Sequence, residues 1–176
     1  MFAQAILASF LLTMPLEREP LTDVQRRRVA GLAQLEPPPA DPTNQYSMND
    51  GAALLGQRLF FDERMSRNGE VSCATCHVPK LGFADGKPLA MGLAEGERHT
   101  PSLLNAGWHR WFFWDGRADT LWSQALHPFE KDAEFGTTRM TVIHHVAEDP
   151  VLRAQYESVF GPLPPLEDEN RFPRSA

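Results

Sequence analysis

The run Cys73-Ala74-Thr75-Cys76-His77 decides how this chain of 176 residues is interpreted. It holds both cysteines of the sequence, separated by two residues and followed at once by a histidine. This spacing is typical of the covalent attachment of a c-type haem. The two thiols are placed to add across the two haem vinyl groups as thioethers, and the adjacent imidazole is placed to ligate the iron. The sequence therefore predicts one haem c, which is anchored by Cys73 and Cys76 and whose iron, the metal of the site, is ligated by His77.

Three other interpretations compete with haem attachment. A redox-active C-x-x-C pair is expected beside a β-α-β pattern, which this sequence does not show. A structural zinc site needs a second pair of ligands at finger-like spacing, and the chain has no other cysteine. A disulfide across so short a loop leaves His77 without a role. Dithiol chemistry and metal binding stay open as alternatives.

Outside this run, the hydrophobic pattern and the turn residues predict an all-α domain with long structured loops. No alternating strand pattern longer than a few residues occurs, and turn-forming residues are dense from 62 to 115. Long ordered loops in a small domain usually surround something. The prolines at 37–42 predict a stiff linker after a first short helix. Helices are expected to begin near Thr22 or Asp23, Asn49 or Asp50, Asp119, Thr138 and Asp149.

Composition narrows the function classes. The chain carries 17 basic and 23 acidic side chains, a formal net charge of −6, so it lacks the basic face that binds phosphate backbones. Nucleic acid is not expected as a partner. A hydrophobic content of 42% argues against global disorder. Residues 2–16 carry no charge and are too short to span a bilayer, so residues 1–16 form either a secretory signal or a buried or partly disordered N-terminus.

Six stretches resemble, in order, the N-terminal haem domain of bacterial dihaem cytochrome c peroxidases and the related MauG-like enzymes. The resemblance covers about two thirds of the chain, from residue 55 to 164, and implies a cytochrome c-like helical domain in which hydrogen peroxide is reduced at the haem. It also implies a second domain or subunit with another C-x-x-C-H, which receives electrons from a small cytochrome c or cupredoxin. The stretches are LGQRLFFDERMS, GEVSCATCH, GFADG, RHTPSLLNA, FFWDGRADTLWSQAL and the acidic segment after it.

The resemblance assigns roles to further residues. Gln124 matches the family's active-site glutamine, Glu134 its active-site glutamate, and Trp114 the tryptophan between the two haems. Pro128 falls where MauG-like enzymes carry a distal-pocket proline. Splitting the O–O bond of peroxide independently requires a proton to move between its oxygens, which a carboxylate near an open distal face can do. We expect Glu134 as acid and base, Gln124 as a hydrogen-bonding group and Trp114 as an electron conduit.

The neighbours of Trp114 are expected to be structural. Trp108, Trp111, Phe112 and Phe113 form an aromatic cluster whose ordinary role is core packing. Asp115 and Arg117 are expected to form a buried pair that fixes the turn.

Two departures from the family pattern shape the functional hypothesis. Leu93 stands where peroxidases with a six-coordinate resting haem carry a distal histidine, and leucine cannot bind iron. The chain also holds no second C-x-x-C-H. We expect a short helix and linker over 17–45, a haem domain over 46–165 and a tail over 166–176, without the second haem domain.

The leading hypothesis is a cytochrome c peroxidase-like oxidoreductase of the periplasm, since c-type haem is attached outside the bacterial cytoplasm. Two alternatives remain, a monohaem electron-transfer module and an incomplete fragment of a dihaem peroxidase.

Overall fold

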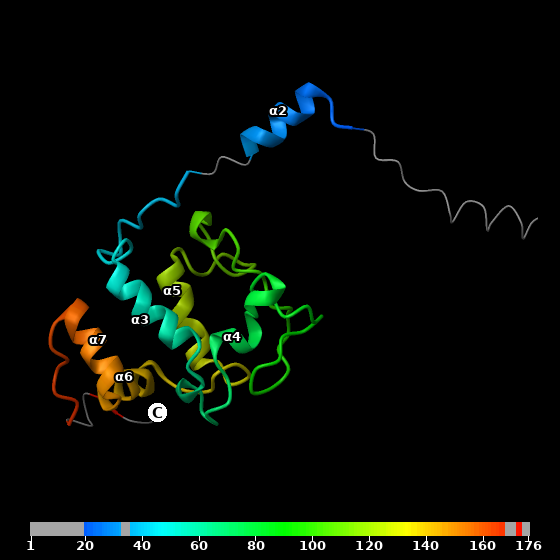
Figure 1. Ribbon diagram of the computed structural model, residues 1–176. Helices are drawn as coiled ribbons and strands as arrows, with labels where there is room; N and C mark the ends of the chain where they lie inside the picture. Colours follow the sequence, from blue (N-terminus) through cyan, green and yellow to red (C-terminus); the bar gives the residue numbers. More distant parts are fainter. Residues whose placement is uncertain (1–19, 33–35, 168–171, 174–176) are drawn as a thin grey trace, which may run out of the picture. The chain divides into compact units, whose positions relative to one another are not determined.

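The computed structural model describes residues 20–32, 36–167 and 172–173, and divides into two units, 1–37 and 38–176 (Figure 1). In the first unit the described element is helix α2, Asp23–Leu32, which confirms the expected first helix. Its Val24 and Val29 are both exposed. Residues 1–16, and with them the prediction of a secretory signal, lie outside the described residues. Among the described helices, none has the length and apolar character needed to cross a membrane.

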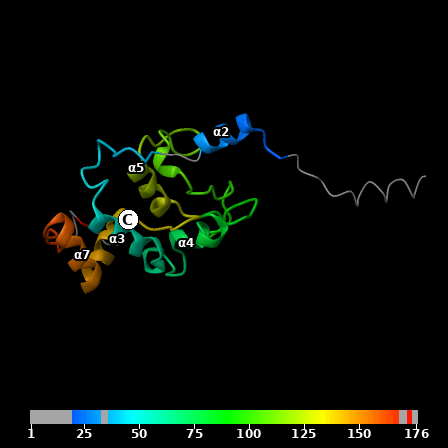
Figure 2. The same cartoon turned by 45° about the horizontal axis from the view of Figure 1, so that its top comes forward.

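The second unit is built around three helices, α3 (Asp50–Phe60), α6 (Arg139–Glu148) and α7 (Pro150–Phe160). Figures 1 and 2 show them side by side at one end of the unit. Each begins at the residue type that its sequence predicts, because Asn49, Thr138 and Asp149 accept hydrogen bonds from backbone N–H groups of the first turn. Their apolar faces meet in a core of Leu55, Val146 and Leu152, against which Leu59, Tyr156, Phe160 and Leu163 pack.

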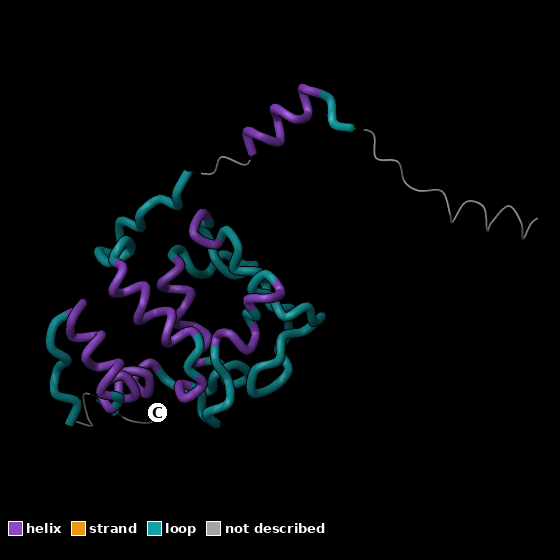
Figure 3. The backbone as a smooth tube through the Cα atoms, in the orientation of Figure 1, coloured by secondary structure: helices purple, strands orange, loops and turns teal. Residues whose placement is uncertain are grey.

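The rest of the unit consists of short helices joined by long loops, as Figure 3 shows. Within the described ranges, extended pairing is limited to three isolated bridges, Val78 with Ala84, Met91 with Glu95 and Phe112 with Ala118. The expected all-α fold with long structured loops is therefore confirmed. The short helices are η1 (Glu63–Met65), α4 (Cys73–Cys76), η2 (Pro79–Leu81), η3 (Ala106–Trp108), α5 (Leu121–Leu126) and η4 (His127–Glu130).

One expected helix start is wrong. Helix α5 is capped by Thr120, whose hydroxyl accepts from the Ser123 N–H at 3.2 Å, and not by Asp119. Thr120 has the extended backbone conformation of an N-cap directly before the first helical residue, whereas Asp119 lies one residue too early. On α3, Leu54 is exposed although Leu55 is buried, because neighbouring helical positions point about 100° apart.

The aromatic cluster is only partly a core. Phe112 is buried, but the side chains of Trp108, Trp111 and Trp114 are exposed, so the expectation of core packing is wrong for Trp108 and Trp111. Phe112 donates its N–H to the Ala118 carbonyl at 2.8 Å in a short extended pairing. Neighbouring residues of an extended chain face opposite sides, so burial of the Phe112 side chain turns the side chain of Trp111 away from the interior.

Asp115 and Arg117 do form the expected ion pair, at 2.9 Å, but the pair is not buried. The side chains are 39% and 44% exposed, respectively. The turn that carries them lies at the surface, so the pair gains little from its mutual attraction.

Candidate haem site

The haem-attachment run occupies a single helical turn, α4. The turn is held by backbone bonds, in which the His77 N–H donates to the Cys73 carbonyl at 2.8 Å. Before it, the buried Ser72 donates its N–H to the Thr75 hydroxyl at 3.0 Å, which fixes the entry of the chain. Residues 73–77 therefore form one helical turn with its C-cap, and this short segment carries both thiols and the imidazole.

The imidazole of His77 is oriented by the loop that follows. Its Nδ1 lies 3.0 Å from the carbonyl oxygen of Phe83. A carbonyl can only accept a hydrogen bond, so Nδ1 carries the proton and Nε2 keeps a free lone pair. The loop returns to α4 because Gly82 and Phe83 both have positive φ, 67° and 58°, and Val78 pairs with Ala84. Such a backbone contact on the second nitrogen is the usual way in which a ligating histidine is oriented.

Both cysteines are free thiols and half-buried. Burial is the main cause that raises the pKa of Cys73 to about 11, and burial also raises the pKa of Cys76. The negative charge of Glu134 adds to the rise at both thiols. Both groups are therefore protonated at neutral pH, which leaves little of the thiolate that forms disulfides or attacks electrophiles.

Glu134 lies on a turn that packs against the thiol side of the site. This turn, residues 130–136, is the acidic turn, and the 91–95 loop runs beside it. The N–H groups of Leu93 and Ala94 donate to the carbonyls of Glu134 and Ala133 at 3.2 and 3.0 Å. The 91–95 loop also reaches α4, where the Cys76 Sγ lies 3.5 Å from the Met91 carbonyl oxygen. The structure thus brings Glu134 and the thiols of α4 into one neighbourhood.

Gln124 and Pro128 belong to the segment that leads into the acidic turn. Gln124 lies half-buried on α5, and η4, which contains Pro128, follows directly. The acidic turn folds back on η4, since the Phe135 N–H donates to the Pro128 carbonyl at 3.3 Å. Helix α5 and η4 therefore lead directly into the acidic turn that carries Glu134.

Trp114 is placed differently from these residues. Its side chain is 73% exposed, and the guanidinium carbon of Arg98 lies 4.3 Å from the ring centroid. This is the geometry of a cation–π contact at a surface. The role of Trp114 as an electron conduit stays a prediction.

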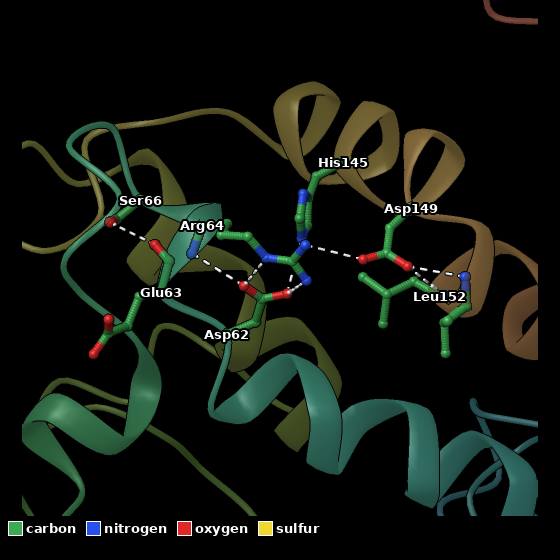
Figure 4. Close-up of polar contacts among 8 residues, drawn as sticks. Asp62, Glu63, Arg64, Ser66, His145, Asp149 and Leu152 are labelled. Carbon is green, nitrogen blue, oxygen red and sulfur yellow. Dashed lines mark hydrogen bonds and ion pairs between the residues drawn. The ribbon is translucent and has the colours of Figure 1, made fainter.

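The structure also shows polar groups that the sequence analysis missed. Asp62 and His145, 83 positions apart, are joined by a 2.9 Å contact, and Arg64 bridges Asp62 and Asp149 (Figure 4). Asp62 is half-buried, and burial alone would raise the pKa of its carboxyl group. Hydrogen bonds from Arg64 and His145 outweigh burial and lower this pKa to about 2. No short-range signal could reveal so distant a pairing. An open groove of about 860 Å³ borders this cluster, and no haem-site residue lines it.

Lys131 was missed as well, although its sequence position carried a signal. Its Nζ lies 3.0 Å from the Glu134 Oε1. The spacing of three residues places two side chains of a tight turn close together, so opposite charges at that spacing could have been taken as a pair.

The donor set fits a c-type haem. Two protonated thiols on one helical turn would supply the thioether anchors, and the neighbouring imidazole would present Nε2 to the iron. A helical domain with this set has the features of a c-type haem protein, and comparison with known proteins defines it further.

The family model for di-haem cytochrome c peroxidase matches residues 50–174. The MauG methylamine utilization protein of Methylorubrum extorquens is 40% identical over 114 residues, which cover 64% of this chain and 32% of the relative. The cytochrome c551 peroxidase of Nitrosomonas europaea is 36% identical over 115 residues, covering 64% of this chain and 34% of the relative. The chain belongs to the di-haem cytochrome c peroxidase family, and it spans about a third of the length of these curated relatives.

Solved structures agree with this assignment. A MauG-like protein associated with microbial copper homeostasis superposes with a TM-score of 0.64 at 31% identity, covering 71% of this chain and 38% of that protein. The diheme peroxidase BthA of Burkholderia thailandensis superposes with a TM-score of 0.59 at 29% identity, covering 72% and 34%. The expected cytochrome c-like helical haem domain and the resemblance to MauG-like peroxidases are both confirmed.

Proposed function

We propose that this chain reduces hydrogen peroxide at one covalently bound haem c, with electrons from a small donor protein of the cytochrome c or cupredoxin type. Support comes from family members named as cytochrome c peroxidases. The observation that carries the proposal is the position of Glu134, because the backbone of its turn is hydrogen-bonded to the 91–95 loop, and that loop contacts the Cys76 thiol. A proton-transfer group thus lies beside the predicted haem anchors.

Three residues of the chain have separate roles in the proposed reaction. When bound, the haem supplies the redox chemistry by which peroxide, two electrons and two protons become two waters. His77 offers Nε2 to the iron, because its Nδ1 proton is engaged by the Phe83 carbonyl. Glu134 takes a proton from one peroxide oxygen and returns it to the departing oxygen. The amide of Gln124 holds peroxide by hydrogen bonds.

Leu93, which the resemblance places where some peroxidases carry a distal histidine, would offer the iron no ligand. Its side chain packs against the acidic turn, where its Cδ1 lies 2.9 Å from the position that a Cβ on Gly136 would take. A hydrocarbon at this place cannot bind iron, so a peroxide molecule meets no competing side chain from Leu93.

The test is peroxide-dependent oxidation of a reduced cytochrome c by haem-loaded protein, produced with the c-type maturation machinery. Glu134→Gln is expected to lower the rate at least about a hundredfold, the lower range for a general acid-base group. Glu95→Gln, an exposed glutamate on the neighbouring loop, is the matched control and should retain the wild-type rate. Absence of turnover in wild-type protein with normal haem content would exclude the peroxidase function.

The ferric absorption spectrum separates the proposal from a monohaem electron-transfer module. A high-spin spectrum that changes on addition of peroxide or cyanide supports the peroxidase. A low-spin, six-coordinate spectrum that responds to neither would favour electron transfer.

The proposed location is the periplasm, because c-type haem is attached outside the bacterial cytoplasm. Cell fractionation with a haem stain tests it. Haem-bearing protein in the cytoplasmic fraction alone would contradict this location.

A further inference from the structure

The backbone of Glu134 is fixed from two sides. Its N–H donates to the Lys131 carbonyl at 2.9 Å within the acidic turn, and its carbonyl accepts from the Leu93 N–H at 3.2 Å. Gly92 lies so close that a Cβ there would stand 2.9 Å from the Glu134 Cα. The freedom left to Glu134 is therefore mainly that of its side-chain torsions.

The side chain of Glu134 forms an ion pair with Lys131. The Nζ of Lys131 lies 3.0 Å from Oε1, and the two side chains are 50% and 36% exposed. The other cations around the acidic turn are engaged with other carboxylates, since Arg67 pairs with Asp132 and Arg139 pairs with Glu130. Lys131 is thus the cation that the structure assigns to the predicted proton-transfer group.

We propose that Lys131 is a positioning residue, which holds the Glu134 carboxylate in the orientation required for proton transfer at the haem site. The inference rests on the proposed function, because it presumes that Glu134 moves a proton. A half-exposed ion pair contributes little to stability. The value of the contact lies instead in removing rotamer freedom from a flexible glutamate, since a misoriented acid-base group loses rate steeply.

The test compares two ligands of the haem-loaded ferric protein. Hydrogen cyanide must give up its proton when it binds, so its association rate reports the proton acceptor, whereas imidazole binds without proton loss. Lys131→Met keeps the length of the side chain and removes its charge, and Lys131→Arg keeps the charge. Lys80→Met removes an exposed lysine on η2 and serves as the matched control.

We expect Lys131→Met to slow cyanide association and the peroxide reaction by about three- to fivefold, because a half-exposed ion pair biases the orientation of a carboxylate only modestly. Lys131→Arg should restore both rates to the wild-type values, because the charge-assisted contact is retained. Imidazole affinity and the Lys80→Met variant should match wild type. In the Glu134→Gln background, Lys131→Met should have no further effect on cyanide.

Several results would overturn the role of Lys131. Cyanide association unchanged in Lys131→Met would do so, as would failure of Lys131→Arg to restore it. An equal fall in imidazole affinity would show a general loss of the site rather than lost orientation. If wild-type protein binds cyanide but does not turn over peroxide, the proposed function fails, while the cyanide and imidazole comparison still decides whether Lys131 orients Glu134.

Discussion

Replacing Asp62 by asparagine should weaken the junction between α3 and the pair α6 and α7. The Asp62 side chain is only 9% exposed, and it accepts hydrogen bonds from Arg64 Nε and Nη2 at 2.8 and 2.7 Å. The Nε2 of His145, on α6, lies 2.9 Å from Oδ2, the oxygen that also accepts from Arg64 Nη2. Arg64 continues to Asp149, whose carboxylate caps α7 (Figure 4). Asparagine keeps the shape but removes the charge that all these donors share.

The size of the expected loss of stability follows from the pKa of Asp62. Burial alone would raise this pKa, but the hydrogen bonds from Arg64 and His145 lower it from 3.8 to about 2. By linkage, a fall of this size corresponds to about 2 kcal/mol of stability at neutral pH. Because the folded-state pKa is depressed, this contribution is fully present above the unfolded-state value of 3.8 and is lost as the pH falls through about 2.

Urea unfolding of haem-loaded protein, followed by far-UV circular dichroism, measures the effect. At neutral pH Asp62→Asn should lower the free energy of unfolding by about 2 kcal/mol. The difference from wild type should shrink as the pH is lowered from about 4 towards about 2. Asp132→Asn is the matched control, because that carboxylate also pairs with an arginine but is 95% exposed. Equal losses in the two variants, or a difference that does not change with pH, would contradict this stabilising role of the Asp62 carboxylate.

Four further substitutions test the packing by urea unfolding. Gly92→Ala should lower the free energy of unfolding by about 1–3 kcal/mol, because its Cβ would stand 2.6 Å from a carbonyl oxygen of the acidic turn. Gly56→Ala, at an open position of α3, should stabilise the protein by about 0.5–1 kcal/mol. Trp122→Phe removes the 3.0 Å bond from the indole to the Thr43 hydroxyl and should cost about 1 kcal/mol; it should add nothing in a Thr43→Val background. Leu152→Ala should cost about 2–5 kcal/mol by opening a cavity in the core, and a smaller loss would show that the core closes over it.

Local signals were sufficient for most of the helical framework. Asn49 and Asp149 lie directly before the helices that they cap, so the few residues around each of them encode a helix start. The same holds for α4, where the spacing within Cys73–His77 is that of one helical turn. Where the local signal was ambiguous, as between Asp119 and Thr120, the helix began one residue later than expected.

Surface and interior were harder to predict in the loops. An aromatic cluster such as Trp111, Phe112 and Trp114 indicates apolar area but not which side chains are buried. Which of these side chains turns inward depends on the pairing of Phe112 with Ala118 and on the positive φ of Phe113. Loop directions of this kind are set by backbone geometry and not by hydrophobicity.

The sequence by itself determined the prediction of a c-type haem site, because the predicted anchors and iron ligand lie within five consecutive residues and their spacing is a property of one turn. Only the tertiary structure decided what surrounds that turn. The approach of Glu134 to the thiols, its contact with Lys131 and the pairing of Asp62 with His145 depend on how separate segments pack. Contacts between residues distant along the chain arise from the burial of shared apolar faces, which no short stretch of sequence specifies.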